Sequence, residues 1–543
     1  MTDENESIDI NEAFENLLFA EEVAQNSGYA LGFEVGKTRL VNGYHLGYHR
    51  ASVLAAQLGY YSGILEQYLH NRANASEKAS YIARELLREI EHFPRHNYES
   101  LDILKNFEGI KSRYAREMIR YEEHLNDILR FTSTYDKLIN CHLVDFISED
   151  LWDKCLPSEL KHELELGQID DLFSKEYDTL PALNAILKAG KSLSLHSKSL
   201  TTTLDHFLAD LSYDPYALTH LESSNPTDAR PPLIGPKKYY EVEALGTVVA
   251  HLAKLIDGLV VDAGAGKAYL STHLAVRHKV PVLAIDSSAA CAKGAIDRQR
   301  KLKRRNREYA NLPKIQYAIE AIDDATDYTK MVNQLFTNWR IKENLVLTGL
   351  HTCGSLAHSI FKSFLSTRDF KILSVIPCCY HLASDTFGKS YSFSKNARML
   401  AQQSLERTMI NKKIPSHLFY RAVLQVLLRE MGNYRLRAKV GRGGPTTDFP
   451  SYAQWALLKV GIESSKIPSA SDLELFYHSQ AAWKKKFDIF QKMRIFMGPL
   501  VEASIILDRM VFLQNSGKCS KIALLRLFDP VVSPRCYAIL AMK

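Results

Sequence analysis

Histidine and cysteine residues follow two apolar runs of the sequence. The run 345–350 leads into a His-x-Cys-Gly element, and the run 372–377 leads into Cys-Cys-Tyr-His. Imidazole titrates near neutral pH and can act as a general base, whereas a cysteine becomes a nucleophile where its pKa is lowered. The candidate catalytic residues are His351, Cys353, Cys379 and His381.

Two other interpretations of these residues stay open. Cysteines next to apolar strands are often inert packing residues. The histidines and cysteines, with Cys378 among them, could instead hold zinc. However, His-x-Cys and Cys-Cys-x-His lack the Cys-x-x-Cys pairing that is typical of zinc sites, so no metal site is predicted.

A third apolar run leads into a glycine-rich turn at 262–267. Glycines at the first strand-to-helix junction of an open α/β sheet let the backbone approach a nucleotide-type cofactor. About twenty residues later, a second strand ends in a carboxylate that could accept hydrogen bonds from ribose hydroxyls. Another acid after the segment 315–322 could approach the adenine amine. The predicted cofactor residues are Asp262, Gly264, Gly266, Lys267, Asp286 and Asp323.

The turn favours one cofactor over another. Tyr269 stands where a dinucleotide Gly-x-Gly-x-x-Gly motif has its last glycine, and Asp262 enters the turn. This arrangement resembles S-adenosylmethionine-dependent class I methyltransferases more than NAD enzymes, and an acid suits a cofactor that bears an ammonium group. NAD and a glycine turn that binds nothing are the alternatives.

The elements that must position these residues are parallel strands alternating with helices. Ligands of such sheets bind at the carboxyl ends of the strands, so both His/Cys elements should face the crevice beside the glycine turn. The fold class expected is α/β, with a Rossmann-like class I methyltransferase sheet preceded by an all-α N-terminal module.

Several further segments support a family resemblance over about residues 120 to the end. They are Pro236 to Val242, Gly349 to Gly354, Cys378 to His381, Phe419 to Ala422 and Asp529 to Arg535. These segments resemble the methyltransferase-like protein family twenty-five, whose relatives are also called ribosomal RNA adenine dimethylase domain-containing. The two His/Cys elements also resemble tRNA 2′-O-methyltransferases of the thirteenth family, which implies an RNA target. The Asn/Asp-Pro-Pro-Tyr motif of adenine-amino methyltransferases is absent.

The N-terminal region repeats a small residue at every fourth position from Gly28 to Gly36 and, after a seven-residue step, from Gly43 to Gly63. Such a stripe lets another helix approach closely. It predicts either a helical hairpin packed on its own domain or a surface for a helical protein partner. Residues 10–118 resemble the deca-Gly-x-x-x adaptors of cytosolic iron–sulfur protein assembly, which implies an adaptor without catalysis.

Composition limits the class of protein. The chain has 543 residues, 46% of them hydrophobic, with a net charge of +6 and eight cysteines at irregular spacing. These values exclude a disordered chain or a disulfide scaffold. No export signal or apolar run of about 20 residues is visible, so a cytoplasmic and possibly nuclear protein without membrane contact is expected.

The expected organisation has four parts. An adaptor-like module over 1–118 is followed by a helical segment over 119–222, a proline-rich linker over 223–236 and a methyltransferase-like domain over 237–543. A basic run, Arg298 to Arg307, could bind phosphates or form a solvated helix face.

The predicted function is methyl transfer from S-adenosylmethionine to an RNA or protein acceptor. The alternative is a non-catalytic assembly protein with a degenerate methyltransferase fold.

Overall fold

A computed structural model describes most of the chain from residue 121 onwards and short stretches before it. The described residues are 34–37, parts of 51–69, 77–94, 106–107, 110, 121–167, 179–197, 200–203, 234–305, 315–337, 343–383, 387, 393–411, 414–432, 440 and 443–543. They fall into two compact units, Met1–Ile119 and Arg120–Lys543. Residues 223–233 of the predicted linker and the stripe residues Gly28, Gly32, Gly43 and Gly47 lie outside the described residues.

The described part of the N-terminal unit is helical. Helix α2 spans Glu77–Glu91, and its buried Leu86 packs in one cluster with Leu65. A second cluster gathers Leu58 with Phe107 and Ile110.

The described stripe residues between 51 and 66 do not belong to either cluster. These residues, Ala51, Ala55, Gly59 and Gly63, are exposed. A methyl group added at Gly59 or Gly63 would meet no atom of the described residues within 4 Å. Leu58 and Leu65 are buried in these clusters. The hairpin and the partner surface both stay predictions.

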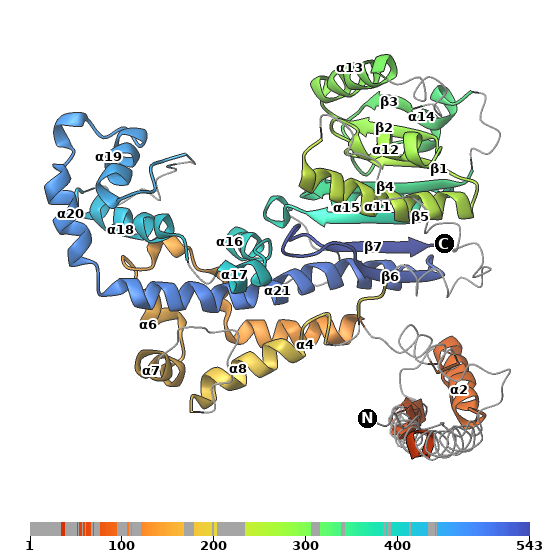
Figure 1. Ribbon diagram of the computed structural model, residues 1–543, viewed down its shortest axis with the longest axis horizontal. Helices are drawn as coiled ribbons and strands as arrows, with labels where there is room; N and C mark the ends of the chain where they lie inside the picture. Colours follow the sequence, from red (N-terminus) through yellow and green to blue (C-terminus); the bar gives the residue numbers. More distant parts are fainter. Residues whose placement is uncertain are drawn as a thin grey trace, which may run out of the picture. The chain divides into compact units, whose positions relative to one another are not determined.

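A seven-stranded sheet forms the centre of the C-terminal unit (Figure 1). Its order is β3-β2-β1-β4-β5-β7-β6. Strands β1 to β5 are parallel, β7 is antiparallel to both β5 and β6, and β1 lies between β2 and β4. The bounds are Leu259–Ala263 (β1), Val282–Asp286 (β2), Ile315–Ile319 (β3), Leu345–Cys353 (β4), Phe370–Cys378 (β5), Lys521–Arg526 (β6) and Tyr537–Met542 (β7).

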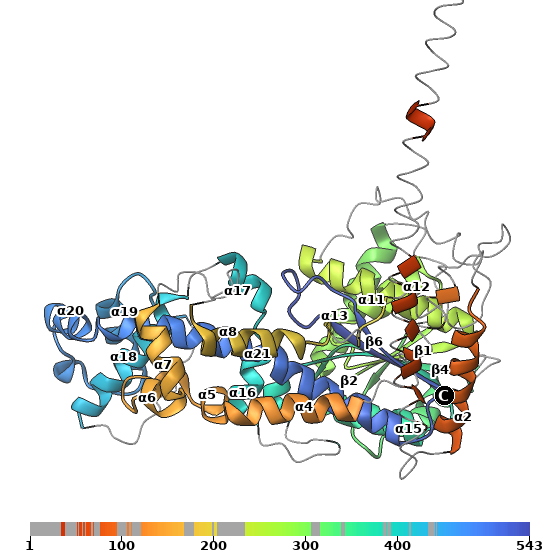
Figure 2. The ribbon, with the colours of Figure 1, turned by 90° about the horizontal axis from the view of Figure 1, so that it is seen from below.

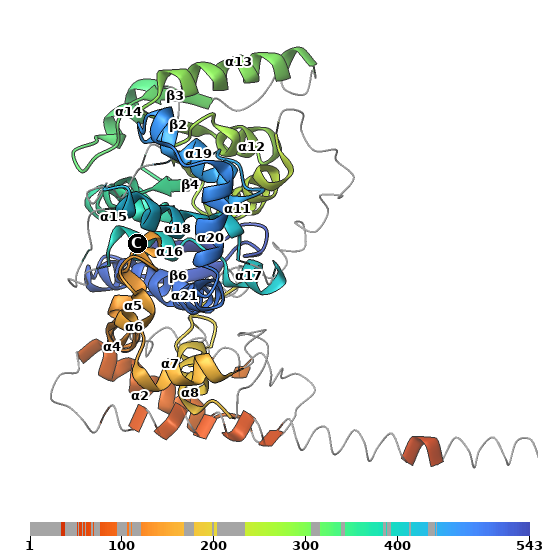
Figure 3. The same ribbon diagram turned by 90° about the vertical axis from the view of Figure 1, so that its left-hand side faces the viewer.

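Helices cover both faces of the sheet, as Figure 3 shows. The helices of the sheet region are α11 (Pro236–Leu255), α12 (Tyr269–Arg277), α13 (Ala289–Arg305), α14 (Tyr328–Leu335) and α15 (Ser355–Ser366). Apolar side chains of α11 and α12 form one continuous core with Val260, Val346 and Ile372 of the sheet. Because both faces are covered, the parallel strands are nearly all apolar, as the sequence runs predicted.

A helical lobe extends from the sheet between β5 and β6. It contains α16 (Lys395–Leu400), α17 (Leu405–Asn411), α18 (Ser416–Glu430), α19 (Phe449–Lys459), α20 (Ala470–Ser479) and the long α21 (Trp483–Asn515). The earlier helices α4 (Tyr121–Thr134), α5 (Asp136–Asn140), α6 (Leu151–Cys155), α7 (Ser158–Leu166) and α8 (Pro181–Ser192) belong to the same unit.

Helices α4 and α8 lie along α21 (Figure 2). Buried Arg494 of α21 donates hydrogen bonds to the backbone oxygens of Leu138 and Cys141. The described helices of the predicted segment 119–222 are therefore part of the lobe. Thr202 adds to the edge of the sheet by donating its N–H to the oxygen of Leu524.

The predicted fold class, an α/β sheet preceded by a helical N-terminal part, is confirmed. Among the described residues, no helix combines the length and the apolar character that a membrane crossing requires.

Candidate cofactor and acceptor site

The glycine loop follows β1 with three residues in the left-handed backbone region. The φ angles are +73° at Gly264, +53° at Gly266 and +50° at Ala268. The N–H groups of Gly264 and Ala265 both donate to the oxygen of Ile285 on β2, at 2.9 Å. The loop is thus held against the end of β2, where the sequence predicted it.

Space around the two glycines differs. A Cβ at Gly264 would lie 2.7 Å from Cδ2 of Leu356, whereas one at Gly266 would meet nothing within 4 Å among the described residues. The backbone at Gly266 is therefore open to a ligand, which is how a glycine loop admits a cofactor.

The carboxylate of Asp286 lies against this loop. One oxygen accepts the N–H of Gly266 at 2.8 Å, and the other accepts the N–H of Ser288 at 2.9 Å. A carboxylate oxygen can accept more than one hydrogen bond, so Asp286 retains capacity for ribose hydroxyls. The structure thus brings together the two halves of the predicted cofactor site.

Asp262 is buried at the end of β1, with 2% exposure. It accepts the hydroxyl of Ser271 at 2.6 Å. Burial raises the pKa of Asp262 to about 6, although the Ser271 hydrogen bonds and the charge of Lys238 lower it. An ammonium group nearby would favour the ionised form.

Arg298 supports the loop from the neighbouring helix α13. The sequence placed this residue in a basic run, but its guanidinium is buried and donates to the oxygen of Ala268 and the hydroxyl of Thr272, both at 2.8 Å. It also stacks 4.0 Å from the ring centroid of Tyr269. Arg298 therefore fixes the loop-to-helix junction, while Arg300, Lys301, Lys303 and Arg304 remain exposed.

The other two predicted cofactor residues are exposed. Lys267 lies at the tip of the glycine loop. The carboxylate of Asp323 folds into its own turn, where it accepts the N–H of Ala325 at 2.9 Å and the hydroxyl of Thr326 at 3.1 Å. A role of Asp323 with the adenine amine stays a prediction.

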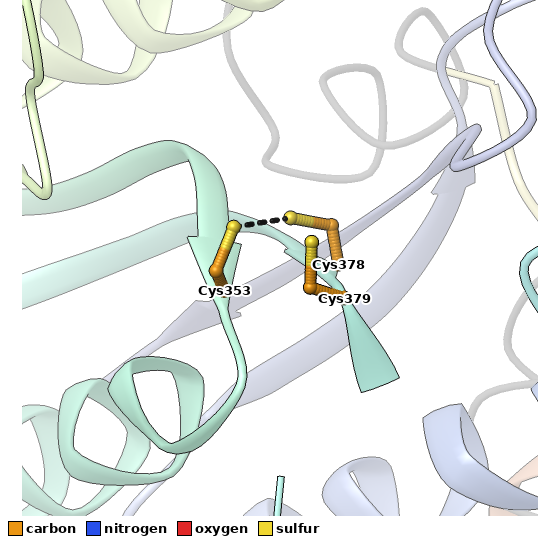
Figure 4. Close-up of side chains that lie close together, drawn as sticks. All are labelled: Cys353, Cys378 and Cys379. Atoms are coloured by element: carbon orange, nitrogen blue, oxygen red, sulfur yellow. Dashed lines mark hydrogen bonds between the residues drawn. The ribbon is translucent and has the colours of Figure 1, made fainter. Parts of the chain in front are cut away.

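Three cysteines meet at the ends of β4 and β5 (Figure 4). The sulfur atoms of Cys353, Cys378 and Cys379 lie within 4.8 Å of one another. Cys353 and Cys378 are opposite each other across the two strands, with their Sγ atoms 3.2 Å apart. Cys353 is exposed, Cys378 is buried and Cys379 is half-buried.

These thiols differ in acidity. The hydrogen bonds with Cys378 and Cys379, together with the electrostatic effect of His351 and Arg535, hold the pKa of Cys353 below its usual range. The same sulfur contact and burial raise the pKa of Cys378. Negative charge is therefore favoured on the exposed sulfur.

The two predicted histidines have different surroundings. The Nε2 atom of His351 lies 3.3 Å from Oε2 of Glu241 on α11. His381 follows β5 in a short 3₁₀ turn, where its Nδ1 is 2.7 Å from Nε2 of Gln402. Each histidine is thus held by a residue from a different element.

Glu241 is a site residue that the sequence reasoning missed. It is 2% exposed and also accepts the hydroxyl of Ser533 at 2.6 Å. Burial would raise the pKa of Glu241, but the hydrogen bonds with His351 and Ser533 lower it to about 2. Glu241 stands between Tyr240 and Val242, but Glu243 follows two positions later, so no sequence signal singles out Glu241.

Comparisons with known proteins agree with this geometry. Residues 237–386 match a family described as "Methyltransferase domain". A human protein named "Probable methyltransferase-like protein 25" is 23% identical over 587 aligned residues, which cover 77% of this chain and 96% of that protein. The mouse protein of the same name is 23% identical, with 78% and 96% covered.

The family match begins in α11 and contains β1 to β5, the glycine loop and all three cysteines. The sheet order is consistent with the methyltransferase domain to which residues 237–386 are similar.

Proposed function

We propose that the protein is a methyltransferase that uses S-adenosylmethionine and holds it between the glycine loop and Asp286. The observation that carries this proposal is the open backbone at Gly266, whose N–H lies 2.8 Å from the Asp286 carboxylate. A ligand there would meet backbone and a ribose-binding acid together, which is the arrangement of nucleotide-type cofactor sites.

The residues present fit this cofactor. The loop offers backbone at positive φ without side-chain obstruction at Gly266, Asp286 offers carboxylate oxygens, and buried Asp262 offers negative charge for an ammonium group. S-adenosylmethionine supplies a methyl group that is already activated, so the protein mainly has to bind and align the acceptor.

The acceptor is proposed to enter at the ends of β4 and β5. These strands are parallel to β1, so their carboxyl ends lie at the same edge of the sheet as the glycine loop. His351, oriented by the buried carboxylate of Glu241, is the group we propose to take the proton from an acceptor. His381, Cys353 and Cys379 line the same strand ends.

We further propose RNA as the acceptor class. The supporting observation is the outer end of α13, where four basic side chains are exposed within five positions, at Arg300, Lys301, Lys303 and Arg304. Transfer of radiolabelled methyl groups from the cofactor to total RNA or to total protein distinguishes the two acceptor classes, and label in protein alone would contradict this choice.

The N-terminal unit is proposed as an interaction module. Its stripe presents Ala51, Ala55, Gly59 and Gly63 outward, as expected of a face that meets a helical partner. A role in iron–sulfur protein assembly rests on the resemblance of residues 10–118 alone.

Calorimetric titration of the full chain with S-adenosylmethionine tests the cofactor proposal. Gly266→Ala should weaken binding at least about tenfold, because it forces a side chain into the left-handed region, at a cost of roughly 1–2 kcal/mol, and fills ligand space. Gly461→Ala is the matched control, since Gly461 also has a positive φ and open surroundings but lies after α19.

Gly266 is a cleaner position for this test than Gly264, where a new side chain would also press on Leu356 of α15. Absence of binding by the unchanged protein, or equal binding by the Gly266→Ala variant, would overturn the assignment of the cofactor site.

A further inference from the structure

We propose that Cys353, Cys378 and Cys379 form a binding site for one zinc ion, with three sulfur ligands from the protein and a fourth position open to solvent. Among the described residues, this is the one group of three or more His, Cys, Asp or Glu side chains whose ligand atoms lie within 4.8 Å of one another. The site does not depend on methyl transfer being the activity of the chain.

The spacing of the sulfur atoms suits a tetrahedral metal. Zinc binds thiolates at about 2.3 Å, which places two sulfur ligands about 3.8 Å apart. In the structure, Cys353 and Cys378 are separated by 3.2 Å, and no pair in the group exceeds 4.8 Å. Small side-chain rotations therefore convert the observed cluster into a ligand set.

The backbone that presents these thiols is unusual at both strand ends. Cys379 has φ +50°, a conformation that residues other than glycine seldom adopt. Gly354, directly after Cys353, has φ +60°, and a Cβ there would lie 2.8 Å from Cβ of Leu382. Such conformations persist only where the surroundings enforce them, and they often mark functional sites.

A buried contact enforces the turn at Cys379. The next residue, Tyr380, donates its hydroxyl to Glu502 of α21 at 2.9 Å, and both side chains are buried. This anchor holds the main chain where the thiols of Cys378 and Cys379 can both turn toward Cys353 (Figure 4). Adjacent cysteines can thus serve as two ligands without the Cys-x-x-Cys loop of common zinc motifs.

The charge of the proposed site follows from its ligands. Three thiolates and a divalent zinc ion would carry one net negative charge. Each thiol releases its proton to solvent when the metal binds.

The exposure of the ligands indicates an open coordination position. Cys378 is buried, whereas Cys353 is exposed at the edge of the sheet where the cofactor loop also lies. Zinc sites with three protein ligands leave the fourth position to water or to a substrate group, whereas closed structural sites have four protein ligands. We therefore expect water or an acceptor group at the fourth position.

Metal analysis of the full chain, purified under reducing conditions and supplied with Zn²⁺, tests this proposal. The unchanged protein should retain one zinc per chain after dialysis, and Cys353→Ser and Cys378→Ser should each lower the affinity for zinc at least about 100-fold. Cys141→Ser is the matched control, because Cys141 also shares a hydrogen bond with a second cysteine, Cys155.

Two further measurements apply even if a variant folds poorly. In the unchanged protein, Co²⁺ should give the intense near-ultraviolet band of cobalt–thiolate bonds, and bound Zn²⁺ should protect Cys353 from alkylation, as mapped by mass spectrometry. The assignment would be overturned if the protein retained no zinc, or if it held iron or copper instead of zinc. A Cys353–Cys378 disulfide under these reducing conditions, or equal alkylation with and without Zn²⁺, would also overturn it.

Loss of the zinc site and loss of the cofactor site are distinguishable. Zinc retention by a protein that does not bind S-adenosylmethionine would contradict only the proposed function, and cofactor binding by a zinc-free protein would contradict only the metal site.

Discussion

The carboxylate of Asp286 and the backbone N–H of Gly266 are joined by a 2.8 Å hydrogen bond. This bond ties the end of β2 to the loop that follows β1, two elements that are also paired through Gly264, Ala265 and Ile285. Asp286 therefore has two roles in the proposed site, because it shapes the loop and faces the ligand.

Replacement of Asp286 by alanine should weaken binding of S-adenosylmethionine on the order of 10- to 100-fold. The variant loses hydrogen bonds to a charged group, each worth roughly 1.5–3 kcal/mol, and releases the loop. Calorimetric titration measures the change. Asp448→Ala is the control, since Asp448 accepts a backbone N–H from Ser451 at 2.8 Å in the helical lobe. Equal losses in both variants would contradict a role in the cofactor site.

Binding of S-adenosylmethionine should depend on pH through Asp262. Burial raises its pKa from 3.8 to about 6, so this carboxyl is mostly protonated at pH 5 and mostly ionised at pH 7.5. An ammonium group needs the ionised form, and affinity should be about tenfold lower at pH 5 than at pH 7.5. Titrations at both values measure this, and Asp262→Asn should remove the difference. A pH dependence that persists in the variant would assign the effect to another group.

The raised pKa of Asp262 changes the stability of the fold in the opposite direction, because stability falls as pH rises whereas cofactor affinity increases. Folded Asp262 holds its proton more tightly than the unfolded chain does, so its contribution to the free energy of unfolding decreases as pH rises from about 4 to about 6. Asp262→Asn should make the protein less sensitive to pH in this range, as measured by denaturant unfolding.

His351→Ala should lower methyl transfer while leaving affinity for the cofactor within a few-fold. A general base contributes on the order of 10² to 10⁴ in rate. Single-turnover transfer of a radiolabelled methyl group to RNA measures the loss, and Glu241→Gln should shift the pH profile of the rate because it alters the partner of the imidazole. His381→Ala is the comparison variant, and a larger loss there would assign the base to His381.

Glu241 should also contribute to stability against acid. Burial opposes its ionisation, but His351 and Ser533 lower its pKa from 4.5 to about 2. The stabilisation is thus fully present above pH 4.5 and is lost as pH falls toward 2. Thermal unfolding between about pH 2 and about pH 7 should show a difference between wild type and Glu241→Gln that shrinks in acid. Glu243→Gln, on the same helix, is the comparison variant, and an equal trend there would contradict this role of Glu241.

Gly59→Ala should leave the N-terminal unit unchanged or stabilise it by up to about 1 kcal/mol. Alanine favours the helix over glycine, and the added methyl group meets no described atom within 4 Å. Denaturant unfolding measures this, with Gly246→Ala as the contrasting variant, because its Cβ would lie 2.5 Å from His273. Destabilisation at Gly59 would show that the stripe packs inside the unit.

The sequence predicts features of this protein that depend on local patterns. Apolar runs identified the strands, and glycines before a helix identified the loop after β1, because both signals lie within a few residues. The placement of Asp286 in the same predicted site as that loop followed from the general geometry of parallel sheets, whereas its hydrogen bond to Gly266 was not predicted.

Features that depend on distant contacts were not predictable in this way. Glu241 becomes a site residue only because α11 brings it to His351 and Ser533. The three cysteines come together through the register of β4 with β5 and the turn at Cys379, neither of which the spacing encodes. The sequence predicted no metal site because it lacks a Cys-x-x-Cys motif. The proposed ligands instead come from the ends of two different strands, which a motif within one segment does not reveal.

The position of β7 in the sheet has a consequence for biosynthesis. β7 lies between β5 and β6, yet it follows the whole helical lobe in the chain. While the ribosome is still making the lobe, the hydrogen-bonding edge of β5 has no partner strand from β7. Exposed strand edges invite pairing with other chains, and long sequence separations slow folding. The nascent protein is thus most prone to aggregation after β1 to β5 have been made and before β7 has been made. Chaperone binding at this stage of synthesis would protect it.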